Sequence, residues 1–223
     1  MEAITLARNK NSNDTKNEII EIATDLFVHK GYDDTTIEDI FKNWGGSKGS
    51  LYYHFKSKEE ILNAVVNTLV ENEEKRIKEI LSKENRNALD LLTLFLVACL
   101  DRPKQLYGLE VGIYQTKNIT LFYRIAKLYI EKSMPILEPI ILQGIDEGIF
   151  KVEYPAEAIE LALMLEELAF KYPMFECNHE QFIRKISAFQ LMLELTLGLE
   201  KDSLNQLSIF LSKNIQRRTH NGV

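Results

Sequence analysis

The sequence predicts an all-α protein, with a small N-terminal domain followed by a larger C-terminal one and about nine or ten helices in total. Apolar residues recur at spacings of three and four along most of the 223 residues, which is the periodicity of amphipathic helices. Capping residues, glycines and prolines separate these periodic stretches from one another. Only residues 150–154 offer a short stretch that could be extended.

The first helix is expected over residues 14–30. Apolar residues such as Ile19, Ala23 and Phe27 fall on one face of it, because three and four residues are close to one helical turn. Gly31 follows directly, and a glycine in this place commonly ends a helix. A single buried stripe is therefore predicted for this helix.

A helix-turn-helix is expected over residues 36–55. A threonine can cap its first helix, with an acidic residue three positions later to complete a capping box. Two adjacent glycines, Gly45 and Gly46, then interrupt the pattern, and Ser47 can cap the next helix. In such a motif the second helix enters the major groove of DNA.

The second helix of this motif carries an unusual set of side chains. Leu51 and Phe55 are four residues apart and share one face, so the polar residues around them point outward. Between Ile40 and Lys58 there are four lysines and no acidic residue, although the whole chain has a formal net charge of −6. A locally basic surface with short hydrogen-bond donors suits phosphates and base edges.

The run from Asp14 to Leu62 resembles the DNA-binding domain of the tetracycline-repressor (TetR) family. The matching pieces are residues 19–27, 31–32, 35–37, 47–55 and 58–62, in the family's order and spacing. The resemblance implies a dimeric transcriptional regulator with a DNA-binding domain at 13–73 and a ligand-sensing and dimerisation domain at 74–223. It favours a repressor that a small apolar or amphipathic ligand releases from a palindromic operator; the alternatives are an activator or a regulator without a small-molecule inducer.

The DNA contacts are expected around the helix that starts at Ser47. Glycine lets a backbone come close to DNA, hydroxyl and phenol groups donate to phosphates, and the family places a basic residue near the start of the first helix. The predicted DNA-binding residues are Lys16, Thr36, Ser47, Lys48, Gly49, Ser50, Tyr52, Tyr53, His54 and Lys58. One of the two tyrosines could be buried instead, and Lys56 is expected to stay solvated.

The turn of the motif departs from the family pattern. The family usually has a small residue, a glycine and an aliphatic residue before the capping serine, whereas this chain has Trp44, Gly45 and Gly46. Trp44 can supply the apolar packing that Gly46 cannot. The departure affects the expected orientation of the second helix, while the helix itself is still predicted.

Seven further helices are expected after the motif. Ser57 and Glu60 resemble a capping box that opens a long helix to about residue 83, which in the family transmits ligand binding as a tilt. Pro135 and Pro139 should kink a later one. The later helices are expected over residues 87–100, 103–115 and 118–145, from 155, from 178, and briefly after 203.

The resemblance places a ligand pocket among the helices after residue 85. Aromatic side chains at helical spacing, and acids that interrupt apolar stretches, are the candidates for its lining. They are Phe95, Tyr107, Glu110, Ile113, Tyr114, Phe122, Tyr123, Glu166, Glu167, Phe170 and Met174. The same aromatic residues could simply fill the core, and the acids could be exposed or paired with Lys or Arg.

The helices that start near Pro155 and Asn178 are candidates for a dimer interface. The first is apolar on several faces, so it must meet more than one partner. The predicted interface residues are Ile159, Leu163, Ile186, Phe189 and Leu193. A two-fold dimer suits a palindromic operator, while the alternative is that these residues fill the core of one subunit.

Other classes of protein find little support. The four histidines are scattered, and neither a metal-ligand spacing nor a phosphate-binding loop nor a nucleophile elbow occurs, so no enzyme, metal or cofactor is expected. Cys99 and Cys177 are expected to be reduced, and the lack of a leader or membrane span favours the cytoplasm. The rival hypothesis is a helical small-molecule carrier with a vestigial DNA-binding domain.

Overall fold

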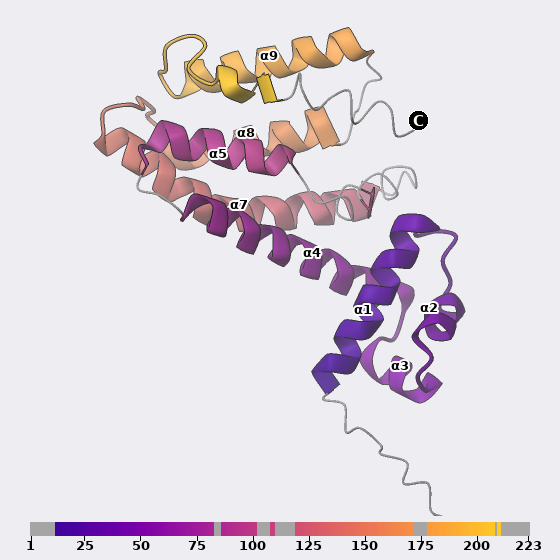
Figure 1. Ribbon diagram of the computed structural model, residues 1–223. Helices are drawn as coiled ribbons and strands as arrows, with labels where there is room; N and C mark the ends of the chain where they lie inside the picture. Colours follow the sequence, from indigo (N-terminus) through magenta and orange to yellow (C-terminus); the bar gives the residue numbers. More distant parts are fainter. Residues whose placement is uncertain are drawn as a thin grey trace, which may run out of the picture. The chain divides into compact units, whose positions relative to one another are not determined.

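The computed structural model describes residues 12–82, 86–101, 108–109, 119–171, 178–207 and 209–210 (Figure 1). Within these ranges every regular element is a helix, which confirms the predicted all-α class. The elements are α1 (Ser12–His29), α2 (Ile37–Trp44), α3 (Lys48–His54), α4 (Lys58–Leu81), α5 (Ala88–Leu100), α7 (Ile119–Asp146), α8 (Pro155–Glu166), the π-helical turn η1 (Glu167–Lys171) and α9 (His179–Thr196).

The chain divides into two compact units. The first comprises residues 1–69 and 104–118, and the second comprises residues 70–103 and 119–223. The division falls inside α4, so this helix begins in the first unit and ends in the second. No helix in the described part of the chain is long and apolar enough to cross a membrane.

The first unit is organised around the apolar stripe of α1. Ile19 and Phe27 of this helix are buried, as are Ile40 of α2 and Leu51 of α3. Figure 1 shows α2 and α3 gathered beside α1. Each such side chain contributes about 1.5–3 kcal/mol when it is fully buried. Gly31 ends α1 with a φ of +90°, as its position after the apolar stripe predicted.

Caps determine where α2 and α3 begin. The Thr36 Oγ1 accepts a hydrogen bond from the Asp39 N–H at 3.1 Å, and the Asp39 carboxylate accepts one from the Thr36 N–H at 2.9 Å, so the expected capping box is confirmed. Gly45 ends α2 with a left-handed φ of +74°. The Ser47 hydroxyl then accepts from the Ser50 N–H at 3.1 Å and caps α3.

The start of α4 differs slightly from the expected capping box. The Ser57 hydroxyl accepts from the Glu60 N–H at 3.1 Å, as predicted. The Glu60 carboxylate, however, accepts from the N–H of Lys56 at 2.6 Å, one residue earlier than a capping box requires. The backbone N–H groups of Lys56 and Glu60 are thus both hydrogen-bonded, and these two bonds fix the chain between α3 and α4.

The second unit consists of the C-terminal part of α4 together with α5, α7, α8 and α9. The long helix α7 contacts both α5 and α8, and Figure 1 shows α9 on the far side of α8 from α7. Phe95 of α5, Leu137 of α7, Leu163 of α8 and Leu193 of α9 belong to one buried apolar core. Asn178 caps α9 through a reciprocal box with Gln181, both bonds being 2.9 Å.

Two features of this unit add to what the sequence predicted. Residues 150–154 link α7 to α8 without pairing as a strand, and the Phe150 ring fills the space that a Cβ on Gly144 would need. The α8 helix ends in the π-helical turn η1, for which the apolar pattern gives no signal. The α7 helix continues through Pro135 and Pro139, and the kink expected there stays a prediction.

Candidate nucleic-acid interface and ligand cavity

The short helix α3 divides into a buried face and an outward face. Leu51 is fully buried and Phe55, which caps the helix, is 3% exposed, as their spacing predicted. Tyr53 is 73% exposed, and Tyr52 is half-buried, so neither of the two tyrosines is lost to the core. Lys48 is exposed on the first turn. The predicted contact residues of α3 are therefore accessible.

Aromatic rings and cations lie close together on this outward face. The Lys48 Nζ lies 5.9 Å from the centre of the Tyr52 ring, and the Tyr53 and His54 rings meet edge to face at 5.1 Å. Lys16 on α1 places its Nζ 5.9 Å from the Phe55 ring. Rings of this kind hold flexible cations near a fixed position, which suits contacts to phosphates.

Gly49 on the first turn of α3 has no internal reason to be a glycine. Its φ is not positive, and a Cβ built on it would meet no atom of the protein within 4 Å. A glycine in a helix costs about 0.5–1 kcal/mol relative to alanine. The missing side chain leaves open space in front of the helix, where another molecule can approach the backbone.

Two of the predicted hydroxyl donors also act as helix caps. The Thr36 hydroxyl donates to the Asp39 carboxylate at 2.8 Å, so its proton is already committed within the protein. The Ser47 hydroxyl only accepts a bond, from the Ser50 N–H, and its own proton remains free to donate outward. Ser47 thus fits the predicted phosphate contact, while Thr36 has a structural role.

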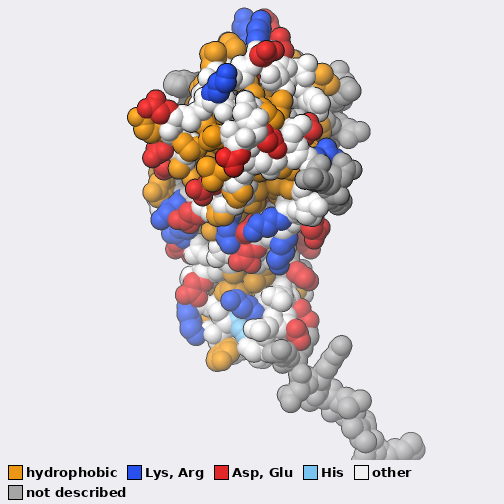
Figure 2. Space-filling model, turned by 90° about the vertical axis from the view of Figure 1, so that its left-hand side faces the viewer, with side chains coloured by type: hydrophobic (Ala, Val, Ile, Leu, Met, Phe, Trp, Pro, Cys, Tyr) orange, Lys and Arg blue, Asp and Glu red, His pale blue; other side chains and the backbone are white. Residues whose placement is uncertain are grey.

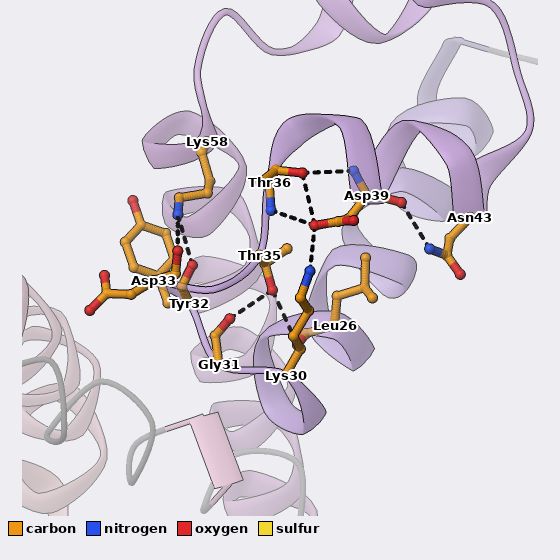
Figure 3. Close-up of polar contacts among 10 residues, drawn as sticks. All are labelled: Leu26, Lys30, Gly31, Tyr32, Asp33, Thr35, Thr36, Asp39, Asn43 and Lys58. Atoms are coloured by element: carbon orange, nitrogen blue, oxygen red, sulfur yellow. Dashed lines mark hydrogen bonds and ion pairs between the residues drawn. The ribbon is translucent and has the colours of Figure 1, made fainter.

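Lys58 also has a structural role, which its position in the sequence did not reveal. Its ammonium group donates to the carbonyl oxygens of Tyr32, at 2.8 Å, and Asp33, at 3.3 Å (Figure 3). It also lies 4.3 Å from the centre of the Tyr32 ring. The side chain therefore ties the start of α4 to the turn after α1 instead of pointing to solvent.

An ion pair stabilises the start of α2 on the same side of the unit. The Lys30 Nζ lies 2.6 Å from the Asp39 carboxylate, which also accepts from the backbone and hydroxyl of Thr36 (Figure 3). These bonds, led by the one from Lys30, hold the pKa of Asp39 well below its usual range. Asp39 therefore stays ionised at neutral pH, as a capping carboxylate must.

The second unit contains an apolar cavity of about 90 Å³ that is lined by α5, α7, α8, η1, α9 and the segment that follows α9. A water molecule needs roughly 10–15 Å³ of such volume, so the cavity can hold a small organic molecule. Its walls are Leu92, Phe95, Leu96, Cys99, Leu137, Ile141, Ala158, Ile159, Ala162, Leu163, Glu166, Phe170, Phe182, Ile186, Phe189, Leu193, Thr196, Leu197 and Leu207.

The cavity includes some of the predicted pocket residues and not others. Phe95, Glu166 and Phe170 line it. Phe122 and Glu167 are buried but are not part of its wall, and Tyr123 is 67% exposed. Tyr107, Glu110, Ile113, Tyr114 and Met174 lie outside the described residues. The sequence analysis did not predict that α9 contributes to the cavity, because it assigned the apolar residues of that helix to a dimer interface or to the core.

The five predicted interface residues lie inside the second unit. Ile159, Leu163, Ile186, Phe189 and Leu193 are all at most 9% exposed, and all line the cavity. Other apolar side chains of α8, η1 and α9 reach the surface. They are Leu161, Met164, Leu165, Leu168, Ile183, Leu191, Met192 and Leu195. Figure 2 shows hydrophobic side chains at the surface of the C-terminal unit, among acidic ones.

Polar contacts join α4 to α5 and α7 within the second unit. Arg76 of α4 donates to both carboxylate oxygens of Glu73, at 2.6 and 2.8 Å, and to the carbonyl oxygen of Ala98 at 2.6 Å. Ala98 precedes the cavity residue Cys99. The Glu74 carboxylate lies 3.1 Å from the Lys132 Nζ of α7. The wall of the cavity is thus bonded to α4.

Among the described residues, no group of three or more His, Cys, Asp or Glu side chains could hold a metal ion. Cys99 is a buried cysteine, and Cys177 lies outside the described residues. The described residues offer two candidate binding sites: the outward, donor-rich face of α3 in the first unit and the apolar cavity in the second.

A helix-turn-helix with such an outward face defines a DNA-binding transcriptional regulator. Residues 19–65 match the family described as bacterial regulatory proteins, tetR family, and residues 110–192 match the tetracyclin repressor-like C-terminal domain. The chain is 34% identical over 134 residues to the biofilm operon icaADBC HTH-type negative transcriptional regulator IcaR of Staphylococcus aureus, covering 53% of this chain and 72% of that protein. It is 27% identical over 151 residues to the HTH-type transcriptional repressor KstR2 of Mycobacterium tuberculosis, covering 66% and 74%.

The chain belongs to the TetR family, as the resemblance of residues 14–62 predicted. Among solved structures, it is similar in fold to RolR in complex with resorcinol, with a TM-score of 0.62, 16% identity and coverage of 88% of this chain and 94% of that one. It is also similar to a TetR-family regulator from Pectobacterium atrosepticum, with a TM-score of 0.63, 19% identity and coverage of 83% and 95%.

Proposed function

We propose that this regulator is a dimeric repressor, which a small apolar or amphipathic molecule releases from a palindromic operator. The observation that carries the DNA part of this proposal is the outward face of α3. Lys48 and Tyr53 are exposed on it, and Gly49 leaves the backbone open to a close approach. The relatives IcaR and KstR2 are named as a negative regulator and a repressor, which supports repression here.

The DNA contacts divide into positioning and reading contacts. Lys16, Ser47 and His54 can bind phosphates, which fix the protein on the duplex without reading sequence. Lys48, Gly49 and Tyr53 lie where the first turns of α3 would meet base edges in the major groove. If about five contacts per subunit neutralise phosphates, the logarithm of affinity falls with the logarithm of salt concentration by about 0.9 per contact.

The apolar cavity is the proposed effector site. Its wall is almost wholly aliphatic and aromatic, and Glu166 and Thr196 are among its few polar residues. An apolar molecule gains free energy by leaving water for such a cavity, while a strongly polar one would lose its hydration without replacement bonds. RolR has been solved with resorcinol, a small aromatic molecule. A compact ligand of similar character would suit this cavity.

The ligand would act by binding one conformation better than another. The C-terminal end of α5 lines the cavity, and its Ala98 carbonyl is bonded to Arg76 of α4. A ligand that displaces α5 therefore acts on α4, the helix that continues into the DNA-binding unit. This is the route by which occupancy of the cavity would reach the helix-turn-helix.

The apolar surface of α8, η1 and α9 is the proposed dimer interface. Leu161 is 65% exposed and Leu195 is 71% exposed, and six other large apolar side chains of these elements are exposed with them. Large apolar side chains exposed in such number on neighbouring elements are typical of an interaction surface. Helices from two subunits would cover it, and the resulting two-fold axis would match the symmetry of a palindromic operator.

The test is binding of the purified protein to duplexes from the DNA upstream of its own gene, at two salt concentrations, with unrelated DNA as competitor. Tight, salt-sensitive binding that resists the competitor supports a specific regulator. Equal binding to both DNAs would place the targets elsewhere in the genome. Absence of binding at low salt, from protein stripped of bound small molecules, would favour the alternative, a helical carrier whose DNA-binding domain is vestigial.

A further inference from the structure

The turn between α2 and α3 is built around a tryptophan and a glycine. Trp44 is the last residue of α2, and Gly46 precedes Ser47, the cap of α3. A Cβ built on Gly46 would fall among the Cη2, Cζ2 and Cζ3 atoms of the Trp44 ring. Gly46 does not have a positive φ. The indole, and not the backbone conformation, is therefore what excludes a side chain at position 46.

The other edge of the indole faces the first helix. The Trp44 Nε1–H donates to the Glu18 carboxylate of α1 at 3.3 Å, in a partly buried contact. Glu18 precedes Ile19, which is fully buried in the core of the first unit. The ring thus lies between α1 and the turn, with its six-membered ring on the backbone of Gly46 and its N–H on α1.

We propose that Trp44 is a positioning residue for α3, and that its indole takes the place of an aliphatic side chain at position 46. Related motifs with a small residue, a glycine and an aliphatic residue would carry that packing on the residue before the serine cap. In this chain the large residue, Trp44, precedes Gly45 and the small one, Gly46, follows it, which is the reverse of that order. The inference rests on the proposed role of α3 in binding DNA.

The position of the turn matters because the first turn of α3 follows it directly. Lys48 and Gly49 come two and three residues after Gly46, so a shift of Gly46 moves both of them. Contacts that depend on fixed geometry lose much of their strength when the supporting packing is loosened. Removal of the indole should therefore weaken specific DNA binding more than it destabilises the unit.

An exchange of the two residues tests the proposal. The variants are Trp44→Ala, Gly46→Val and the double variant Trp44→Ala/Gly46→Val, measured on a duplex that the native protein selects from a random-sequence library. We expect each single variant to lose about tenfold or more in affinity, and the double variant to recover most of it, because residues in direct contact are not additive. Native affinity in Trp44→Ala, or a double variant no better than the weaker single one, would overturn the proposal.

A second readout does not involve DNA. Trp44 is the only tryptophan of the chain, so its fluorescence reports on this turn alone. In Gly46→Ala the new methyl group must displace the indole toward water, and we expect emission at longer wavelength with an unchanged circular dichroism spectrum. Unchanged emission in a folded Gly46→Ala protein would contradict the packing described here. Glu18→Ala should produce a smaller shift, since it removes only the hydrogen bond.

These measurements separate this inference from the proposed function. If the native protein selects no duplex, the DNA-binding proposal fails, while the emission of Gly46→Ala still decides whether Trp44 holds the turn. If the native protein binds and Trp44→Ala binds equally well, only the positioning role fails. If Gly46→Val does not fold, the double variant decides the question. A double variant that folds and binds the duplex supports the exchange, and one that folds without binding the duplex contradicts it.

Discussion

Gly46 and Gly49 are three residues apart, and a side chain at each position would meet different surroundings. Gly46 lies under the indole of Trp44, where any side chain would collide with the protein itself. Gly49 faces open space on the first turn of α3. At the first position the protein excludes the side chain, while at the second the proposed reason is a molecule outside it. Substitution should therefore have opposite effects on stability at the two sites.

Gly49→Ala should stabilise the protein and weaken its binding to DNA. Alanine in a helix is favoured over glycine by about 0.5–1 kcal/mol, and the new methyl group meets nothing within the subunit. The same methyl group would stand between α3 and the groove. Thermal unfolding and operator binding by fluorescence anisotropy measure the two effects. A variant that binds operator as tightly as the native protein would show that Gly49 does not face DNA.

Asp39→Asn should remove part of the pH dependence of stability. The pKa of Asp39 is lowered in the folded protein, chiefly by Lys30, so its contribution is complete above the unfolded-state pKa of about 3.9. The contribution is lost as the pH falls below that value toward the lowered folded-state pKa. Urea unfolding near pH 7 and near pH 3, inside this window, should show a smaller loss on acidification in the variant. Asp34→Asn, in an exposed aspartate nearby, should keep the native pH dependence.

At the scale of helices, the sequence predicted the elements whose signals are local. The apolar stripe of α1, the Thr36 cap of α2 and the Ser47 cap of α3 each depend on residues within one or two turns. The π-helical turn η1 and the role of Lys58 could not be predicted in this way. Lys58 meets Tyr32, 26 residues away, and only the tertiary fold brings these two residues together.

The same limit explains the mixed outcome for the cavity. Phe95, Glu166 and Phe170 stood out in the sequence because they are aromatic or charged, and they line the cavity. The aliphatic residues of α9 gave no such signal. Ile159 and Leu161 are two positions apart on α8, yet one lines the cavity and the other is 65% exposed. A helix that is apolar on several faces does not show which face meets which partner.

Arg76→Met should destabilise the second unit through the carboxylate that it leaves behind. Glu73 is 4% exposed and has both oxygens bonded to Arg76, so the variant buries a charge without its partner. We expect a loss of about 2–3 kcal/mol in the free energy of unfolding. Chemical denaturation measures it. The double variant Glu73→Gln/Arg76→Met should be less destabilised than Arg76→Met, and the opposite order would contradict this explanation.

At the scale of the whole molecule, the two proposed binding functions belong to separate units, and α4 begins in one unit and ends in the other. The first unit presents a polar face on a tightly capped motif. The second has a cavity that its own core residues line, and exposed apolar side chains on two of the same helices. One pair of helices, α8 and α9, thus contributes inward residues to the cavity and outward residues to the proposed interface.

Leu195→Glu should break the dimer without unfolding the subunit. Leu195 is 71% exposed on α9, so a charge there costs little in the free subunit but would be desolvated in the proposed interface. Sedimentation velocity should show a shift toward monomer. Leu142→Glu, at a 48% exposed position on α7, is the matched control and should leave the oligomeric state unchanged. A dimeric Leu195→Glu protein would place the interface elsewhere.

The turn after α9 has a practical consequence for how this protein is handled. The Glu194 carboxylate is 1% exposed and accepts hydrogen bonds from the backbone N–H groups of Asp202 and Leu204, which holds that turn against α9. Leu207, just beyond it, is part of the cavity wall. A chain cut after residue 200 would lose that wall and leave Glu194 without either donor. A shortened chain of this kind would therefore be unsuitable for a ligand screen, because the cavity under test would have lost part of its wall.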